Sequence, residues 1–357
     1  MIDQRVIFKH RSVMRVVLLS VLATFAVQAP ALIAQETQPA VAAEPAPKGR
    51  DIHWGDLIKP GDRLLFVGDQ VTQQMWYTRG FATALLAAMP NDNMRVFNGG
   101  MEDATAGSAI DWIDDLVDLT RPQVVFVCLG FNDGKDEKVK DVLETYHNNL
   151  ATLVAQIKGS QGVREVVLLS PSAVQPGVSP GLDGLNYNSV LEKIAQETRT
   201  VAAREKVSFI DVFAYTKVVW EVASNEHGEL LTLDGHRPME EGHMVIASVI
   251  LRGLGMTPKT FAALGWSPIK GGKMSRVRNA LAIEVPPPGL DEAQKSRDLY
   301  NLIEKNDELF FRAWRLAGKK PSAGTRPAAM AACDGAWGRV DETARRLYGG
   351  SPAPPGK

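Results

Sequence analysis

The chain has 357 residues, 45% of them hydrophobic, which is enough to bury the core of one large domain with extensions at both ends. Forty basic residues balance 41 acidic ones and the formal net charge is -1, so we expect no nucleic-acid partner. The two cysteines, Cys128 in an apolar run and Cys333 in a Gly/Ala-rich tail, offer no disulfide framework.

The N-terminus has the pattern of a secretory signal peptide. Basic residues between positions 5 and 15 precede an apolar stretch over 16–34 that four residues interrupt. That stretch is shorter than the ~20 residues of a usual membrane-spanning helix, so we expect residues 1–34 to be cleaved and no stable membrane span to remain. An uncleaved anchor is the alternative. Residues 35–50, rich in Ala, Pro, Glu and Gln, predict a disordered linker, and the mature protein is expected to be secreted or periplasmic.

Short apolar runs alternate with stretches of helical spacing from residue 51 to residue 256. The run 64–67 (LLFV) is too short for a helix and stops at Gly68 and Asp69, which is typical of a strand buried on both faces. Further strands are predicted at 94–97, 124–129, 165–170 and 207–212, and helices at 74–89, 109–119, 136–157, 185–205 and 239–254. This alternation predicts an α/β fold with a central parallel sheet of about five strands, covered on both faces.

Beyond this domain we predict a C-terminal extension over 257–317. Residues 291–316 carry an apolar stripe at helical spacing, so we expect a helix that packs on the main domain. A helix that binds a partner is the alternative. Residues 318–357 contain five prolines, which predict a flexible tail.

Three sequence blocks carry chemistry. The first strand runs into Gly68-Asp69-Gln70, the third ends before Gly-Phe-Asn-Asp at 130–133, and Asp-Gly-His-Arg at 234–237 precedes the last helix. In this order and spacing the blocks resemble the signature of the SGNH (GDSL-type) hydrolases over about residues 60–256. The resemblance implies a flavodoxin-like SGNH three-layer sandwich. It also implies that Asn132 is an oxyanion-hole donor and that Asp234 is the aspartate of the catalytic triad.

Three positions depart from this family pattern. Gln70 stands in place of the nucleophilic serine, Asp103 in place of the oxyanion glycine, and Arg237 in place of the histidine. An amide does not attack carbonyls usefully, a carboxylate repels a developing oxyanion, and a guanidinium stays protonated. The sequence therefore predicts a catalytically degenerate member. We also hypothesise that Arg237 pairs with Asp103 or Asp234 and fills the space of the lost triad.

Two other interpretations compete with this one. His236 lies one position early and would need a shifted turn to replace the missing imidazole, whereas His243 is predicted on a helix surface. Clustered carboxylates such as Asp69, Glu102, Asp103 and Asp234 can bind calcium or perform acid-base work. We expect neither, and we predict no metal and no cofactor.

The resulting prediction is a secreted SGNH-fold protein without esterase activity that binds a carbohydrate or a small ester in the old cleft. One alternative is an active esterase or deacetylase of acetylated carbohydrates or esters with non-standard catalytic residues. Another is an interaction module built on the C-terminal helix and the flexible ends. The oligomeric state leaves no trace in the sequence.

Overall fold

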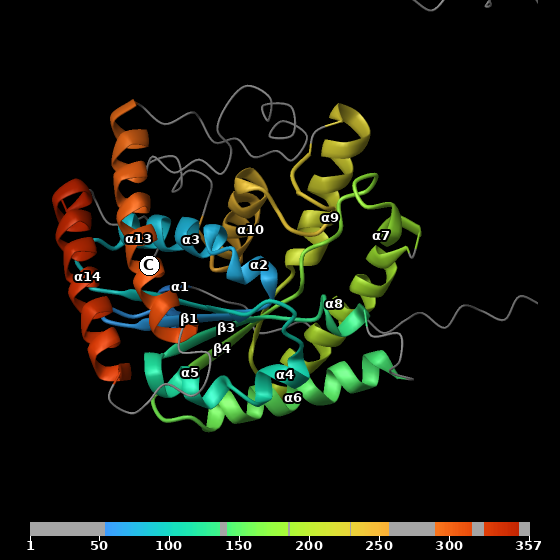
Figure 1. The fold of residues 1–357 in the computed structure, drawn as a ribbon, viewed down its shortest axis with the longest axis horizontal. Helices are drawn as coiled ribbons and strands as arrows, with labels where there is room; N and C mark the ends of the chain where they lie inside the picture. The colour runs from blue at the N-terminus through green and yellow to red at the C-terminus, as the bar shows by residue number, and fades with distance from the viewer. Residues whose placement is uncertain are drawn as a thin grey trace, which may run out of the picture. The chain divides into compact units, whose positions relative to one another are not determined.

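The computed structural model describes residues 54–135, 141–184, 186–228, 230–256, 290–315 and 325–349. All of them fall within one compact unit, Pro45–Lys357 (Figure 1). The predicted signal peptide (1–34), the linker (35–50) and residues 257–289 of the extension lie outside the described residues. Within the described ranges, no helix combines the length and the apolar character needed to cross a membrane.

Five parallel strands form the central sheet in the order β2-β1-β3-β4-β5. Their bounds are β1 Arg63–Gly68, β2 Arg95–Gly100, β3 Val124–Cys128, β4 Glu165–Leu169 and β5 Ser208–Ile210. This is the flavodoxin-like strand order, in which ligands bind beyond the carboxyl ends of the strands. The predicted parallel α/β sheet is confirmed.

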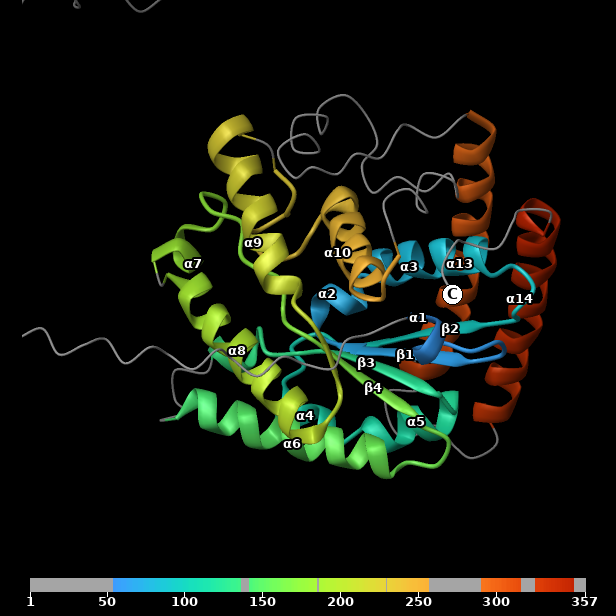
Figure 2. The ribbon, with the colours of Figure 1, turned by 180° about the vertical axis from the view of Figure 1, so that it is seen from behind.

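Helices cover both faces of the sheet, as Figures 1 and 2 show from opposite sides. The helices of the main domain are α1 Trp54–Leu57, α2 Gln70–Gln73, α3 Trp76–Ala88, α4 Ala106–Ile110, α5 Ile113–Thr120, α6 Val142–Gly159, α7 Pro180–Gly184, α8 Tyr187–Glu205, α9 Val212–Val222 and α10 Glu240–Gly253. A 3-10 turn spans Asp133–Lys135, and a π-helical turn, Ala223–His227, extends α9. Helices α3 and α10 lie together on one face, and α5, α6 and α8 lie on the other. Helix α9 was not predicted.

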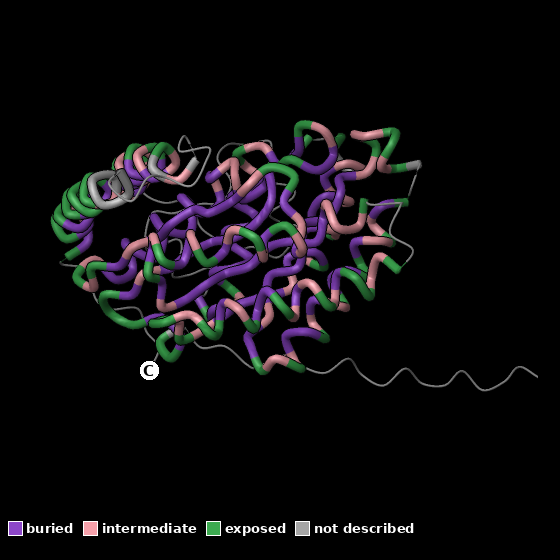
Figure 3. Tube along the Cα trace, turned by 60° about the horizontal axis from the view of Figure 1, so that its bottom comes forward, coloured by how far each residue is buried: buried purple, intermediate pink, exposed green. Residues whose placement is uncertain are grey.

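The core is centred on β1. Its residues Leu64, Leu65, Phe66 and Val67 are all 0% exposed, so both faces of the strand are buried, as its unbroken apolar run predicted. The Phe66 ring stacks on Phe126 with centroids 4.5 Å apart. Burial is continuous along the strands, and exposed residues gather on the outer sides of the helices (Figure 3). Each fully buried side chain of this size stabilises the fold by about 1.5–3 kcal/mol.

The C-terminal region is a pair of helices, α13 Leu290–Arg315 and α14 Thr325–Tyr348, that pack against each other. The expected helix at 291–316 is present. The prediction of a flexible tail over 318–357 is wrong for residues 325–348. Cys333, Trp337, Val340 and Ala344 are buried at helical spacing, and Pro327 falls in the first turn, where a helix tolerates proline.

Helix α13 lies across the β2 edge of the sheet. Arg79 of α3, a helix on one face of the sheet, forms ion pairs with two residues of α13, Asp307 at 3.0 Å and Glu304 at 2.8 Å. On β2, Phe97 contacts Phe310 with ring centroids 5.2 Å apart. Because these contacts join α13 both to a helix on one face and to the edge strand, the extension packs on the main domain as predicted.

Candidate functional site

The end of β1 fixes the position of Gln70. Gly68 is packed so tightly that a Cβ there would overlap Thr72 Oγ1 and would lie 2.8 Å from the Cys128 carbonyl oxygen. Asp69 then caps α2, its Oδ1 accepting from the Val71 backbone N–H at 2.9 Å. Gln70 is therefore the first residue of α2, just beyond the carboxyl end of the strand.

Gln70 and Asn132 form a reciprocal amide pair. Asn132 Nδ2 donates to Gln70 Oε1 at 2.8 Å, and Gln70 Nε2 donates to Asn132 Oδ1 at 3.2 Å. Asn132 Nδ2 also donates to the Ala104 carbonyl oxygen at 3.1 Å. The structure thus brings together the positions predicted as nucleophile and oxyanion donor, and each amide occupies the hydrogen-bonding groups of the other.

Asp103 follows β2 in a left-handed backbone conformation with φ 57°. This conformation favours glycine, which is consistent with the alignment of Asp103 to a glycine of the family pattern. Its side chain is exposed, and its charge acts on Lys135, raising the pKa of that ammonium against the larger lowering effect of burial.

Asp234 and Arg237 form the predicted ion pair, with Arg237 Nε 2.8 Å from Asp234 Oδ2. The Arg237 backbone N–H also donates to Asp234 Oδ1 at 2.7 Å. Partial burial alone would raise the pKa of Asp234, but these hydrogen bonds lower it below its usual value. The two side chains are 42% and 46% exposed, so the pair lies at the surface and does not fill an interior space. That part of our hypothesis is wrong.

The buried side chain of this loop is His236. It is 4% exposed, and its ring stacks on Phe131 with a centroid distance of 3.1 Å and an interplanar angle of 6°. Burial, followed by the nearby charge of Lys135, lowers its pKa well below the usual range, so the imidazole is neutral. Lys135 Nζ also lies over the Phe131 ring, 4.2 Å from its centroid.

A buried carboxyl, Asp69, and a partly buried one, Asp133, flank the amide pair. Burial raises the pKa of Asp69 to about 7, with a further contribution from the charge of Asp133. Burial also raises the pKa of Asp133 to about 6, although its Oδ1 accepts from the Ala106 N–H at 2.9 Å. Both groups serve the backbone at the ends of strands, so their first role is structural.

No hydroxyl of the described chain is hydrogen-bonded to His236. Ser172, in the segment after β4, lines the same small cavity as His236, but neither ring nitrogen nor Ser172 Oγ has a hydrogen-bond partner among the described residues. Ser172 is 3% exposed and the cavity volume is about 10 Å³, which leaves no room for an acyl substrate. The described site therefore contains no activated nucleophile.

His243 was expected on a helix surface, and this expectation is wrong. It is 0% exposed and stacks on Tyr77 with centroids 6.1 Å apart. Burial lowers its pKa to about 3. The reason is that α10 lies between α3 and α9, so that its residues 242–251, His243 among them, are buried.

The carboxylates of the site do not form a cation-binding cluster within the described residues. Among the described residues, no group of three or more His, Cys, Asp or Glu side chains is arranged to hold a metal ion. Asp69 is buried, Asp103 is exposed, and Asp234 is engaged by Arg237.

Sequence reasoning did not foresee the burial of His236. The signal was the Asp-Gly pair at 234–235, which is a turn-forming dipeptide. Gly235 has φ 86°, and Asp234 Oδ1 accepts from the His236 N–H at 3.1 Å. This tight turn directs His236 inward and leaves Arg237 at the surface.

The strand order and the position of these residues define a flavodoxin-like α/β scaffold with its site at the carboxyl edge of the sheet. Residues 66–245 match the GDSL-like Lipase/Acylhydrolase family. Because this span is half of the 357 residues, the chain belongs to that family. The predicted SGNH resemblance is confirmed.

The chain resembles several solved structures. BT4096, described as a gut microbial diltiazem-metabolizing enzyme, has a TM-score of 0.61 at 16% identity, with 81% of this chain and 97% of that chain covered. The acetylxylan esterase Axe2 from Geobacillus stearothermophilus has a TM-score of 0.47 at 22% identity, covering 56% of this chain and 97% of its own. LAE5, a hydrolase from the metagenome of Lake Arreo, has a TM-score of 0.47 at 21% identity, covering 56% and 98%. A search of curated proteins found no match.

Proposed function

We propose that this chain is a non-hydrolytic member of the GDSL-like family that binds a carbohydrate or a small ester in its cleft. The reciprocal Gln70–Asn132 hydrogen bonds, at 2.8 and 3.2 Å, carry this proposal. They put a neutral amide where acyl transfer needs an attacking oxygen, and they engage the side chain that would otherwise donate to an oxyanion. Beyond these bonds each amide oxygen keeps a second lone pair and Gln70 Nε2 keeps a second hydrogen, so a hydroxyl or carbonyl ligand can still hydrogen-bond to the pair.

The state of the base supports the same conclusion. Arg237, at the family's histidine position, is bound to Asp234 and cannot accept a proton. His236 is neutral but enclosed, and its ring is stacked on Phe131. Neither Arg237 nor His236 can therefore act as the general base for a water molecule in the cleft.

An esterase assay tests the proposal. The purified chain should hydrolyse p-nitrophenyl acetate and acetylxylan no faster than buffer, whereas the triple variant Gln70→Ser, Asp103→Gly, Arg237→His should gain activity. Gln70→Ser alone is the matched control and should stay inactive, because it adds an oxygen without a base. Turnover by the wild-type chain that Gln70→Ala or Asp234→Ala abolishes would refute the proposal.

Binding is tested separately by calorimetric titration with xylo-oligosaccharides and with their acetylated forms. We expect saturable heat of binding for the wild-type chain. We expect Asn132→Ala to weaken the affinity at least about tenfold, a loss of roughly 1.4 kcal/mol of binding free energy. Absence of binding for both probes would remove the carbohydrate part of the proposal and leave the loss of hydrolysis standing.

We also propose that the protein works outside the cytoplasm. The support is the basic and apolar pattern of residues 1–34. Expression of the full chain in a bacterial host, followed by fractionation and N-terminal sequencing, should yield a periplasmic or secreted species that begins near Gln35 or shortly after residue 42. An intact N-terminus in the cytoplasmic fraction contradicts the proposal.

A further inference from the structure

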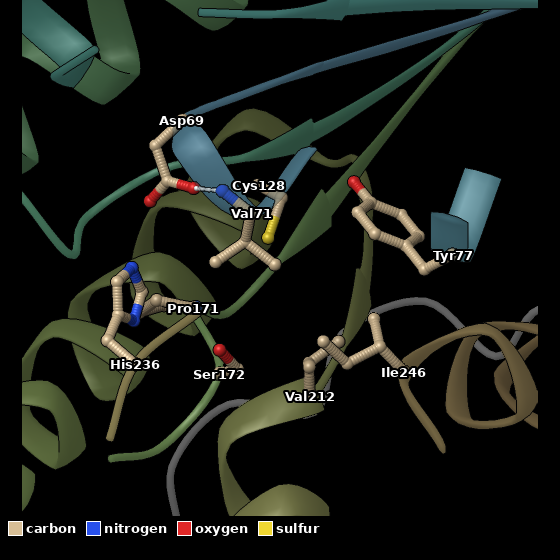
Figure 4. Close-up of a pocket in the computed structure, with 9 residues that line it drawn as sticks. All are labelled: Asp69, Val71, Tyr77, Cys128, Pro171, Ser172, Val212, His236 and Ile246. Atoms are coloured by element: carbon tan, nitrogen blue, oxygen red, sulfur yellow. Dashed lines mark hydrogen bonds between the residues drawn. The ribbon is translucent and has the colours of Figure 1, made fainter. Parts of the chain in front are cut away.

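A small cavity lies inside the protein next to the amide pair. It is bounded by the end of β1, the segment after β4 and the His236 turn, and its volume is about 10 Å³ (Figure 4). Asp69, Ser172 and His236 contribute polar groups to its wall, whereas Val71, Val212 and Ile246 contribute apolar groups. In Figure 4 the Asp69 carboxylate, the His236 ring and the Ser172 hydroxyl are directed toward the same space.

Three polar side-chain atoms of the cavity wall lack hydrogen-bond partners among the described residues. Both ring nitrogens of His236 and the Oγ of Ser172 have no hydrogen-bond partner in the described part of the chain, although the two residues are 4% and 3% exposed. Two other polar atoms of the wall have partners. The Tyr77 hydroxyl is 2.8 Å from Thr72 Oγ1, and Asp69 Oδ1 accepts from a backbone N–H. The unmet hydrogen-bonding capacity is therefore concentrated on His236 and Ser172.

The size and the charge of the cavity select its occupant. Buried polar atoms in proteins are nearly always hydrogen-bonded to protein or to ordered water. A space of about one water-sized sphere with two to four polar partners is what an internal water requires. A cation is disfavoured because Lys135 and Arg237 act on His236 with positive charge.

We propose that this cavity binds one internal water molecule that bridges His236, Ser172 and Asp69. The water donates one hydrogen to a His236 ring nitrogen and the other to the Asp69 carboxylate, and it accepts from the Ser172 hydroxyl. It links three segments that are far apart in sequence and holds the turn that presents Asp234 and Arg237. This inference does not depend on the proposed loss of hydrolysis, because it concerns the interior next to the cleft.

A crystal structure of the full chain, refined with ordered solvent, is the first test. We expect a density peak in the cavity at about 2.6–3.2 Å from a His236 ring nitrogen and from Ser172 Oγ. An empty cavity in a map that shows ordered water elsewhere in the protein interior overturns the proposal.

Urea unfolding of Ser172→Ala and His236→Phe is the second test, and its sign is diagnostic. If the water is present, each variant removes one of its partners, and the unfolding equilibrium constant should rise by on the order of tenfold. If the cavity is dry, each variant removes unpaired polar atoms and unfolding becomes less favourable, which overturns the proposal. Ser248→Ala is the matched control for the removal of a buried hydroxyl that has a protein partner, because the Ser248 hydroxyl donates to the Val245 carbonyl oxygen at 2.7 Å.

Discussion

Replacing Arg79 with methionine is expected to lower the free energy of unfolding of the whole domain by about 3–5 kcal/mol. Methionine keeps an apolar stem of similar length but removes the guanidinium that faces Asp307 at 3.0 Å and Glu304 at 2.8 Å. The side chain of Asp307 is 7% exposed and that of Glu304 is 43% exposed. The cost therefore comes mainly from Asp307, because water can solvate Glu304 when its partner is gone.

The loss should depend on pH with a defined sign. Burial already raises the pKa of Asp307, and the loss of Arg79 raises it further, while the unfolded carboxyl titrates near its ordinary value of 3.8. Between these values the native state of the variant holds a proton that the unfolded chain has released. Its free energy of unfolding thus falls as pH rises. The difference from wild type should be largest near about pH 8 and smaller near about pH 5.

Equilibrium urea unfolding, followed by far-UV circular dichroism and tryptophan fluorescence, measures this effect. Arg297→Met, on the exposed side of α13, is the control and should change stability by less than about 0.5 kcal/mol. An Arg79→Met loss below about 1 kcal/mol, a loss that does not vary with pH, or a separate early transition of the C-terminal helices would refute the reasoning. The first two results would mean that Asp307 does not carry the cost, and the third would mean that α13 does not fold as one unit with the sheet.

Three further predictions concern the site and its surroundings. Asp69→Asn keeps the cap of α2 but removes a carboxyl whose pKa burial raises to about 7 from 3.8. In the wild-type chain this carboxyl makes the free energy of unfolding fall as the pH rises from about 4 to about 7, so in urea titrations the variant should show a fall that is smaller by up to about 4 kcal/mol. The Cβ that Gly68→Ala adds lies 2.8 Å from the Cys128 carbonyl oxygen, so this variant should lower the urea midpoint by the equivalent of about 1–3 kcal/mol or more. Gly159→Ala is the control and should be neutral, because a Cβ at that position has no neighbour within 4 Å. Burial lowers the pKa of His243 to about 3 from 6.5, so stability is lost as pH falls below about 6.5, and His243→Phe should shift acid unfolding to lower pH.

The sheet could be predicted because its strands are buried on both faces and leave unbroken apolar runs. Helix α9 could not be predicted on the same basis, because the run 207–212 was assigned wholly to a strand. In the structure β5 ends at Ile210, and Asp211 caps α9 by accepting from the Ala214 N–H at 3.0 Å. An aspartate inside an apolar run can mark the start of a helix, and Asp211 is such a signal.

Helix α14 was missed for a different reason. Its glycines and Pro327 resemble a loop, and its apolar positions become meaningful only when a partner surface is known. Trp337 packs on Phe97 with ring centroids 6.4 Å apart, and Arg95 of β2 pairs with Asp341 at 2.8 Å. These contacts join residues more than 200 positions apart, which no local pattern can indicate.

That Gln70 and Asn132 lie close together was predictable, because parallel strands bring their carboxyl ends to one edge of the sheet. The Asp234–Arg237 pair was also within reach, since the two residues are three positions apart. The reciprocal bonding of Gln70 to Asn132 and the inward turn of His236 were not, because both depend on side-chain geometry between separate segments.

The position of α13 and α14 across the β2 edge bears on whether this edge can pair with a strand of another molecule. An edge strand presents a row of unpaired backbone groups that can recruit a strand from another molecule. Here β2 spans six residues, Arg95–Gly100, and the helix pair guards it, whereas the opposite edge strand β5 is three residues long. A shortened chain ending before Leu290 would uncover the longer edge, so oligomers and insoluble aggregates are the expected products of such a truncation.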